Sequence, residues 1–202
     1  MNSGQNDQTG AGPDNLRPAL LIMDYQADMI GMQPESVQSA LLDRAARLLD
    51  RARNSGVPVF YVVVQFREGY PEISPQNKLF SSIRDAGRLI EGAPLTRIHP
   101  RVAPKPGEPV VVKRRVGAFS TTDLEALLRA RNIRHLILFG IATGGVVLST
   151  VRWAADMDYL LTVISDACAD RDPEVHRILT EKVFPRQAKV LTTEEFLSNP
   201  PL

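Results

Sequence analysis

The chain has 202 residues, which is long enough to bury one sizeable hydrophobic core and short for two. Its composition is 44% hydrophobic and 23% charged, as in ordinary globular proteins, and its formal net charge is only +1. Such an even balance gives no extended surface of one sign that would hold nucleic acid. We therefore expect a globular protein with no nucleic-acid partner.

The first seventeen residues are polar and rich in glycine, and they lack the basic start and apolar stretch of a signal peptide. We expect residues 1–17 to form a flexible tail, followed by a single domain over residues 18–202. No apolar run approaches the roughly 20 residues that cross a bilayer, so no membrane partner is expected. Cys168 is the only cysteine, as is ordinary in a reducing compartment, and we expect a cytoplasmic protein.

From residue 18 onward, short apolar runs alternate with amphipathic stretches, which is typical of helices that cover a mostly parallel sheet. The pattern predicts strands over residues 18–23, 59–64, 110–112, 135–139, 160–164 and 188–191. It predicts helices over residues 38–54, 81–88, 120–131, 146–157, 173–183 and 193–197. These elements predict an α/β fold, a three-layer α/β/α sandwich with a Rossmann-like, six-stranded, mostly parallel sheet.

Residues 65–108 interrupt this rhythm with a stretch rich in proline and glycine. A long insertion in a compact domain is often a lid, an active-site wall or an oligomer contact, and an ordinary surface loop is an equal alternative.

Ligand sites in folds of this class lie at the carboxyl ends of the strands. Asp24 directly follows the first predicted strand, where burial would raise its carboxyl pKa towards the range useful for proton transfer. Lys113 follows the strand at residues 110–112, where its ammonium group could stabilise negative charge. Both have simpler interpretations, Asp24 as a turn or cap residue and Lys113 as part of a solvated basic run.

A glycine-rich turn, FGIATGGVV at residues 139–147, ends one predicted strand and begins a helix. Such turns can bring backbone N–H groups close to a ligand oxygen. The spacing of its glycines does not match the dinucleotide-binding or phosphate-binding loops, so we expect no nucleotide cofactor.

Several segments together resemble the isochorismatase-like, or cysteine hydrolase, family: LLIMDYQADM, KRRVGAFSTTDL, GIATGGVVLST and SDACAD. The resemblance covers nearly everything from residue 18 to residue 197. It implies hydrolysis of a small molecule without a cofactor, and assembly into a homodimer or homotetramer. Asp24 and Lys113 match two members of the family's Asp-Lys-Cys triad.

The third member of that triad is missing. The resemblance places Val146 at the position of the nucleophilic cysteine, and valine has no nucleophilic atom. It also implies a cis peptide bond between Ala142 and Thr143. The residues that it assigns to substrate binding are Gln65, Phe119, Ala142, Thr143 and Val146.

The resemblance also bears on metal binding. Nicotinamidases of this family carry an Asp-x-His pair after the second strand, where this chain reads Gln65-Phe66-Arg67. The three histidines of the chain show no ligand spacing, so we expect no metal site.

Two hypotheses follow for the function. The first is a hydrolase that acts on a small carboxylate, vinyl ether or amide-like molecule without a covalent intermediate, with Asp24 as general acid or base and Lys113 as its electrostatic partner. The second is a catalytically silent relative that serves as a binding or oligomer-forming protein. Retention of both Asp24 and Lys113 favours the enzyme, because an idle buried ion pair is costly.

Overall fold

The structure is a computed structural model, and it describes residues 16–199. Six strands form one sheet in the order β3-β2-β1-β4-β5-β6, and all five pairings are parallel. The predicted tail at residues 1–17 lies almost wholly outside the described residues. The strands are β1 (Pro18–Met23), β2 (Val59–Val64), β3 (Val110–Lys113), β4 (His135–Gly140), β5 (Leu160–Ile164) and β6 (Lys189–Leu191).

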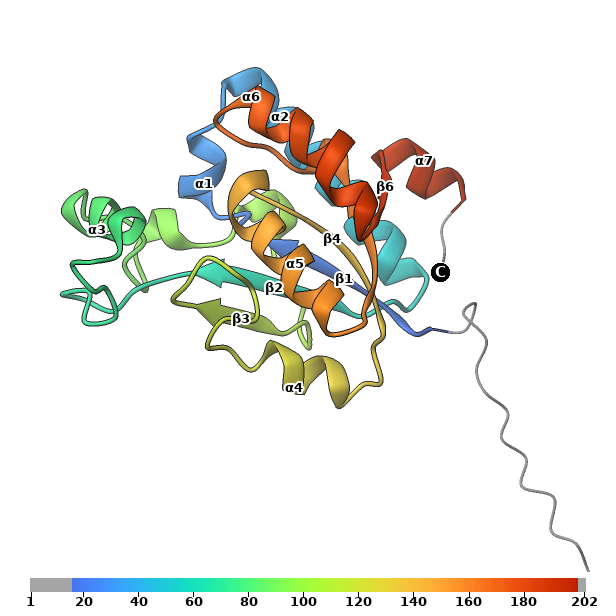
Figure 1. The fold of residues 1–202 in the computed structure, drawn as a ribbon, viewed down its shortest axis with the longest axis horizontal. Coiled ribbons are helices and arrows are strands. Elements are labelled where there is room, and N and C mark those ends of the chain that lie inside the picture. Colours follow the sequence, from blue (N-terminus) through green and yellow to red (C-terminus); the bar gives the residue numbers. More distant parts are fainter. Residues whose placement is uncertain (1–15, 200–202) are drawn as a thin grey trace, which may run out of the picture.

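Helices cover both faces of this sheet (Figure 1). Right-handed crossovers run from β1 to β2 in one direction and from β4 to β5 in the other, so α2 lies on one face and α5 on the opposite face. None of the helices within residues 16–199 is long and apolar enough to span a membrane. The helices are α1 (Ala27–Gly31), α2 (Glu35–Asn54), α3 (Lys78–Asp85), α4 (Leu124–Arg129), α5 (Leu148–Asp156), α6 (Pro173–Ile178) and α7 (Thr193–Ser198).

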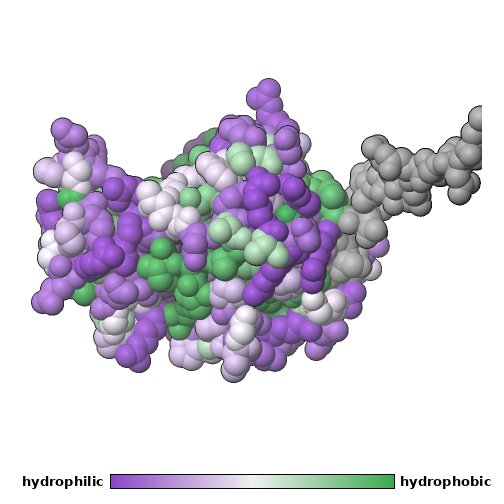
Figure 2. Space-filling view, turned by 90° about the horizontal axis from the view of Figure 1, so that it is seen from below, coloured by the Kyte–Doolittle hydropathy of each residue, from purple (hydrophilic) through white to green (hydrophobic). Residues whose placement is uncertain are grey.

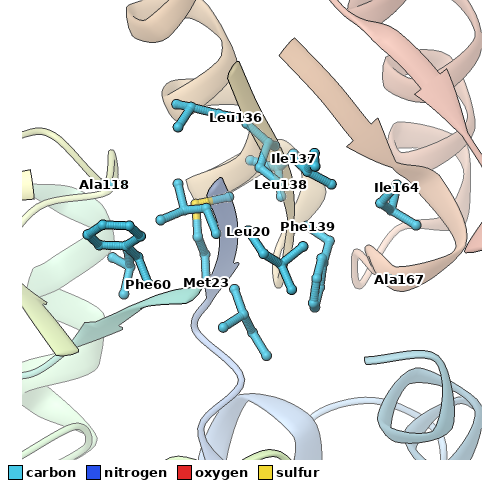
Figure 3. Packing of buried hydrophobic residues seen from close by; sticks show 14 of the residues in the cluster. Leu20, Met23, Phe60, Ala118, Leu136, Ile137, Leu138, Phe139, Ile164 and Ala167 are labelled. Atoms are coloured by element: carbon cyan, nitrogen blue, oxygen red, sulfur yellow. The ribbon is translucent and has the colours of Figure 1, made fainter. Parts of the chain in front are cut away.

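The central strands explain why the sequence shows continuous apolar runs. Every residue of β2 and β4 is buried, as is all of β1 after Pro18, because helices cover the sheet on both sides. Figure 3 shows Leu20, Phe60 and Leu138, from three neighbouring strands, within the same core. The predicted six-stranded α/β architecture is confirmed.

Helix boundaries differ more than strand boundaries from the prediction. The helix α2 begins three residues early, at Glu35, because the carbonyl oxygen of Pro34 already accepts hydrogen bonds from Val37 and Gln38. The predicted helix start at Ser120 is wrong, since α4 begins only at Leu124. Within the preceding segment, Thr121 has a left-handed conformation with φ at 61°, which does not fit a right-handed helix, and the Ala118 N–H before it donates to the Thr150 hydroxyl. The short helix α1 was not predicted.

From β1 the chain adds β2 and β3 on one side of the sheet, and it then adds β4, β5 and β6 on the other side. This change of side between β1 and β4 places the carboxyl ends of these two parallel strands beside an open crevice. The two strands approach closely where they end. A Cβ atom at Gly140 would lie 2.7 Å from the Met23 carbonyl oxygen and 2.9 Å from the Met23 Cβ. Only glycine fits at this position without moving one of the strands.

We therefore expect Gly140→Ala to lower the free energy of unfolding by about 1–3 kcal/mol, as overpacking of a core does. Gly31→Ala is the matched control, because no atom lies within 4 Å of a Cβ at that position. Chemical denaturation of both variants measures the effect. Equal stability of the two variants would contradict the close approach of β1 and β4.

Candidate active site

Asp24 is the first residue after β1, and it lies at the floor of the crevice. Its backbone adopts a left-handed conformation, with φ at 57°, which Asp and Asn tolerate better than most residues do. Its N–H donates to the carbonyl oxygen of Val62 at 2.8 Å, which fixes it beside the end of β2. Only 3% of the residue is exposed.

Lys113, the last residue of β3, forms an ion pair with Asp24. The distance from Lys113 Nζ to Asp24 Oδ2 is 2.8 Å, and both side chains are almost completely buried. Because β2 separates β1 from β3 in the sheet, the ion pair reaches across the end of β2. Two residues that are far apart in sequence thus meet at the point where the strands end.

The carboxyl group of Asp24 has an unusual electrostatic environment. Burial raises its pKa above the ordinary value, and the charge and hydrogen bond of Lys113 oppose that shift. Its second oxygen, Oδ1, is buried and has no hydrogen-bond partner among the described residues. A carboxyl group in this position is suited to hold a proton and transfer it to a bound molecule.

A cavity of about 270 Å³ opens above this ion pair. Most of its lining comes from α1, from α3 and the residues just after it, from the end of β3 and from the turn after β4. The insertion at residues 65–108 thus forms part of the cavity wall, and Figure 2 shows the surface indented between the lobe that carries α3 and the main body. The lining residues include Asp24, Met29, Met32, Phe80, Ile83, Arg88, Leu89, Lys113, Val116, Ala142, Gly145, Val146 and Arg171.

The glycine-rich turn contributes differently from what its sequence suggests. The N–H groups of Thr143, Gly144 and Gly145 all donate within the protein, to Ala169 O, Asp170 Oδ2 and Ala142 O. These N–H groups are therefore already occupied, and the turn contributes lining residues to the cavity.

The cis peptide bond of this turn lies between Ile141 and Ala142, one residue before the expected Ala142–Thr143 bond. Ile141 is the last residue held by the sheet. Its N–H donates to the Met23 carbonyl oxygen, and it forms a bridge with Ala169. The chain changes direction directly after it.

The structure brings four of the seven expected site residues to one cavity: Asp24, Lys113, Ala142 and Val146. The other three lie outside its lining.

Each of these three has another environment. Phe119 stacks on Trp153, with ring centroids 4.1 Å apart. The Thr143 hydroxyl lies 2.9 Å from His176 Nδ1. Gln65 follows β2 and is held through its backbone, with its N–H donating to the Lys113 carbonyl oxygen.

Sequence reasoning missed Gln26, which supports the site from below. Its side chain is fully buried, donates to the carbonyl oxygens of Val64 and Thr96, and accepts from the Val64 N–H. It thereby ties the residues after β1 to the end of β2 and to the insertion. An amide two residues after a strand-end carboxylate was the available signal.

Cys168 lies in an environment that does not favour a nucleophilic role. Its thiol is buried and donates to the carbonyl oxygen of Ile164 at 3.3 Å. Burial raises its pKa to about 12, so the reactive thiolate is suppressed. Within residues 16–199, no group of three or more His, Cys, Asp or Glu side chains is arranged to hold a metal ion.

Comparison with known proteins gives one consistent result. Residues 18–195 match the isochorismatase domain family. The uncharacterized isochorismatase family protein YwoC of Bacillus subtilis (strain 168) is 33% identical over 184 residues, covering 91% of this chain and 94% of that protein. The ureidoacrylate amidohydrolase RutB of Stutzerimonas stutzeri (strain A1501) is 29% identical, covering 88% of this chain and 76% of its own length.

A solved structure agrees. The isochorismatase family protein of Desulfovibrio vulgaris subsp. vulgaris str. Hildenborough superimposes with a TM-score of 0.80 at 27% identity, covering 92% of this chain and 98% of that one.

The buried ion pair predicts a pH-dependent loss of stability in Lys113→Met. Without the ammonium group, the main opposition to burial is lost, and burial raises the folded-state pKa of Asp24 further above the ordinary value of 3.8. A raised folded-state pKa means that stability falls as the pH rises from the unfolded pKa through the folded one. We expect a loss of about 3–5 kcal/mol at neutral pH and a smaller loss in acid.

Denaturant unfolding at several pH values measures this loss. The double variant Asp24→Asn/Lys113→Met should lose less than Lys113→Met at neutral pH, because no carboxylate is left unpaired. Arg177→Met is the control, since it breaks only the exposed pair of Arg177 with Glu181. A loss in Lys113→Met that does not change with pH would contradict the coupling to Asp24.

The position of Val146 can be tested with a thiol. Because Val146 lines the same cavity as Lys113, Val146→Cys should react with iodoacetamide at least about tenfold faster than the native Cys168 does. Mass spectrometry of the peptides that contain residues 146 and 168 gives both rates in one sample. Equal, slow labelling of both thiols would show that residue 146 does not face an accessible cavity.

Proposed function

Since the chain belongs to the isochorismatase family, we propose that it is a hydrolase of a small molecule that acts without a covalent intermediate, with Asp24 as the proton-transferring group. The observation that carries this proposal is the buried Asp24 carboxyl in the cavity wall, with Lys113 on one oxygen and no partner on the other.

The raised pKa of Asp24 favours a proton donor. Burial stabilises the neutral carboxyl, which can protonate a substrate atom placed next to it. In a vinyl ether, this proton would go to the terminal carbon of the double bond. Water would then add to the resulting cation and give one proton back to Asp24. The C–O bond to the alcohol would break as the second proton of the water moves to the departing oxygen, which leaves a ketone and an alcohol.

Lys113 has the complementary role. Its ammonium group is almost completely buried, and a fixed charge in such a site stabilises developing negative charge more strongly than in water. It would stabilise the carboxylate form of Asp24 between donation of its proton and the return of a proton from water.

Val146, at the position that the resemblance assigns to the nucleophilic cysteine, supports a route without a covalent intermediate. Its side chain is buried in the cavity wall and carries no atom that can attack a carbonyl. In this proposal water is therefore the attacking group. The similarity to an amidohydrolase keeps amide-like substrates within the proposal, with Asp24 then taking a proton from water before passing it to the departing nitrogen.

We expect the purified protein to hydrolyse at least one member of a panel of isochorismate, nicotinamide, N-carbamoyl amino acids and simple esters. Asp24→Asn should abolish that turnover, by about a hundredfold or more, because it removes the transferable proton. Asp158→Asn is the matched control, since Asp158 is an exposed carboxylate with φ at 60°, the same backbone conformation as Asp24.

The pH dependence distinguishes the two roles of Asp24. If it acts as a donor, kcat/KM falls as the pH rises through its raised pKa. If it acts as a base, kcat/KM rises over the same interval. The absence of turnover on the whole panel, or a rate that is the same in Asp24→Asn, would support the catalytically silent alternative.

A further inference from the structure

A second cavity adjoins the one above Asp24. It has a volume of about 470 Å³ and lies between the beginning of α2 and the segment that leads into α6. Met32 lines both cavities, so they share a wall, but neither member of the Asp24–Lys113 ion pair lines the second one. Its volume is within the range of pockets that hold small molecules in proteins. The chemistry of its lining therefore indicates which kind of molecule fits it.

The charges around this second cavity balance. Two arginines and two aspartates line it: Arg44, Arg171, Asp166 and Asp170. Arg44 and Asp166 form an ion pair at 3.1 Å. Burial lowers the pKa of His176, which favours the neutral form of its ring. A charged ligand would lose its hydration here without meeting a net opposite charge, so the lining favours an uncharged molecule.

Gln33 places a buried amide in this lining, and only 6% of the residue is exposed. Its backbone groups already have partners. The N–H donates to the Ile30 carbonyl oxygen at 2.9 Å, and the carbonyl oxygen accepts from the Gln38 side chain at 2.8 Å. Within residues 16–199 the side-chain amide of Gln33 makes no hydrogen bond, although both of its polar atoms keep contact with solvent. The amide thus has two donors and an acceptor left for a molecule in the cavity.

His176 is a further polar group of this lining. Its Nδ1 lies 2.9 Å from the Thr143 hydroxyl, whereas its Nε2 has no hydrogen bond to any other residue between 16 and 199. In one neutral tautomer Nε2 is a donor, and in the other it is an acceptor. A ligand group that both donates and accepts therefore pairs with either form.

Much of the remaining lining is apolar. Val37 and Leu41 extend into it from α2, and Ala169 and Pro173 come from the segment that leads into α6. Met32 lies at the wall shared with the first cavity. These side chains can pack against an apolar body, whose transfer out of water is favourable.

We propose that the second cavity is a separate binding site for a small uncharged carboxamide with an apolar body. A carboxamide carries two donors and an acceptor, so it can exchange two hydrogen bonds with the Gln33 amide and also pair with His176. It brings no charge into a lining whose charges already balance. Its apolar body lies against Val37 and Leu41. This inference does not depend on the proposed function, because none of these groups takes part in the reaction at Asp24.

Binding can be measured without turnover by carbon-13 NMR of the methionine methyl groups in the full chain. Met32 lines both cavities, whereas Met29 lines the one above Asp24 and not the second. Met157 packs against the core elsewhere and serves as an internal reference. The probes are benzamide, phenylacetamide and 3-phenylpropanamide, each compared with its carboxylate. The three lengths sample the depth of the cavity.

We expect at least one carboxamide to shift the Met32 signal more than the Met29 signal and to bind more tightly than its carboxylate. Gln33→Leu should weaken carboxamide binding about tenfold, because the two hydrogen bonds of the amide are lost. Gln76→Leu is the control, since Gln76 is an exposed glutamine that lines neither cavity. It should bind the carboxamide as the native chain does.

A second variant separates the two cavities. Val37 lines the second cavity and not the first, so the larger ring in Val37→Phe should fill part of the second and abolish the Met32 shift. A Met32 shift that survives in Val37→Phe would place the carboxamide above Asp24 and overturn the proposal. Tighter binding of the carboxylates, or full binding of the carboxamide in Gln33→Leu, would overturn it as well.

Discussion

The ion pair between Asp24 and Lys113 is the interaction on which the candidate site depends. Both side chains are almost completely excluded from solvent, and they come from strands that are not neighbours in the sheet. Removing two charges from water costs several kcal/mol per ion, which their mutual attraction offsets only with good geometry. Apolar residues of similar volume would hold the strand ends together at least as well. A reaction that uses the carboxyl is therefore the simplest reason for this chain to carry the pair.

The surrounding fold holds the ion pair in place and keeps it buried. Gln26 links the residues after β1 to the end of β2 through two hydrogen bonds and to the insertion through a third, and Gly140 lets β4 approach β1 closely. The insertion between β2 and β3 closes one side of the cavity with α3. The burial that raises the pKa of Asp24 therefore comes from elements spread over most of the chain. The chemistry of this carboxyl group depends on how all of these elements pack at the ends of the strands.

Much of this could be predicted from the sequence, because buried parallel strands leave continuous apolar runs and the residue after each run is easily found. Asp24 and Lys113 were located in this way, and the strand over residues 59–64 has the predicted bounds. Phe119 and Gln65 show what a motif does not predict, because neither residue lines the cavity. The position of a residue in a motif does not reveal where its side chain points, and that of Phe119 stacks on Trp153. The irregular segment before α4 and the position of Arg171 in the cavity lining depend on tertiary contacts between distant residues. Local sequence patterns do not encode such contacts.

The central claim is that burial, opposed by Lys113, keeps the Asp24 carboxyl more basic than an ordinary aspartate. The most direct measurement is a pH titration of the carboxyl carbon of Asp24 by NMR, in protein labelled at aspartate, with Asp24→Asn to assign the signal. We expect a midpoint above the ordinary value of 3.8 and a further rise in Lys113→Met. A midpoint at or below 3.8 would contradict it, because the carboxyl would then be an ordinary ion-paired carboxylate with no proton to transfer.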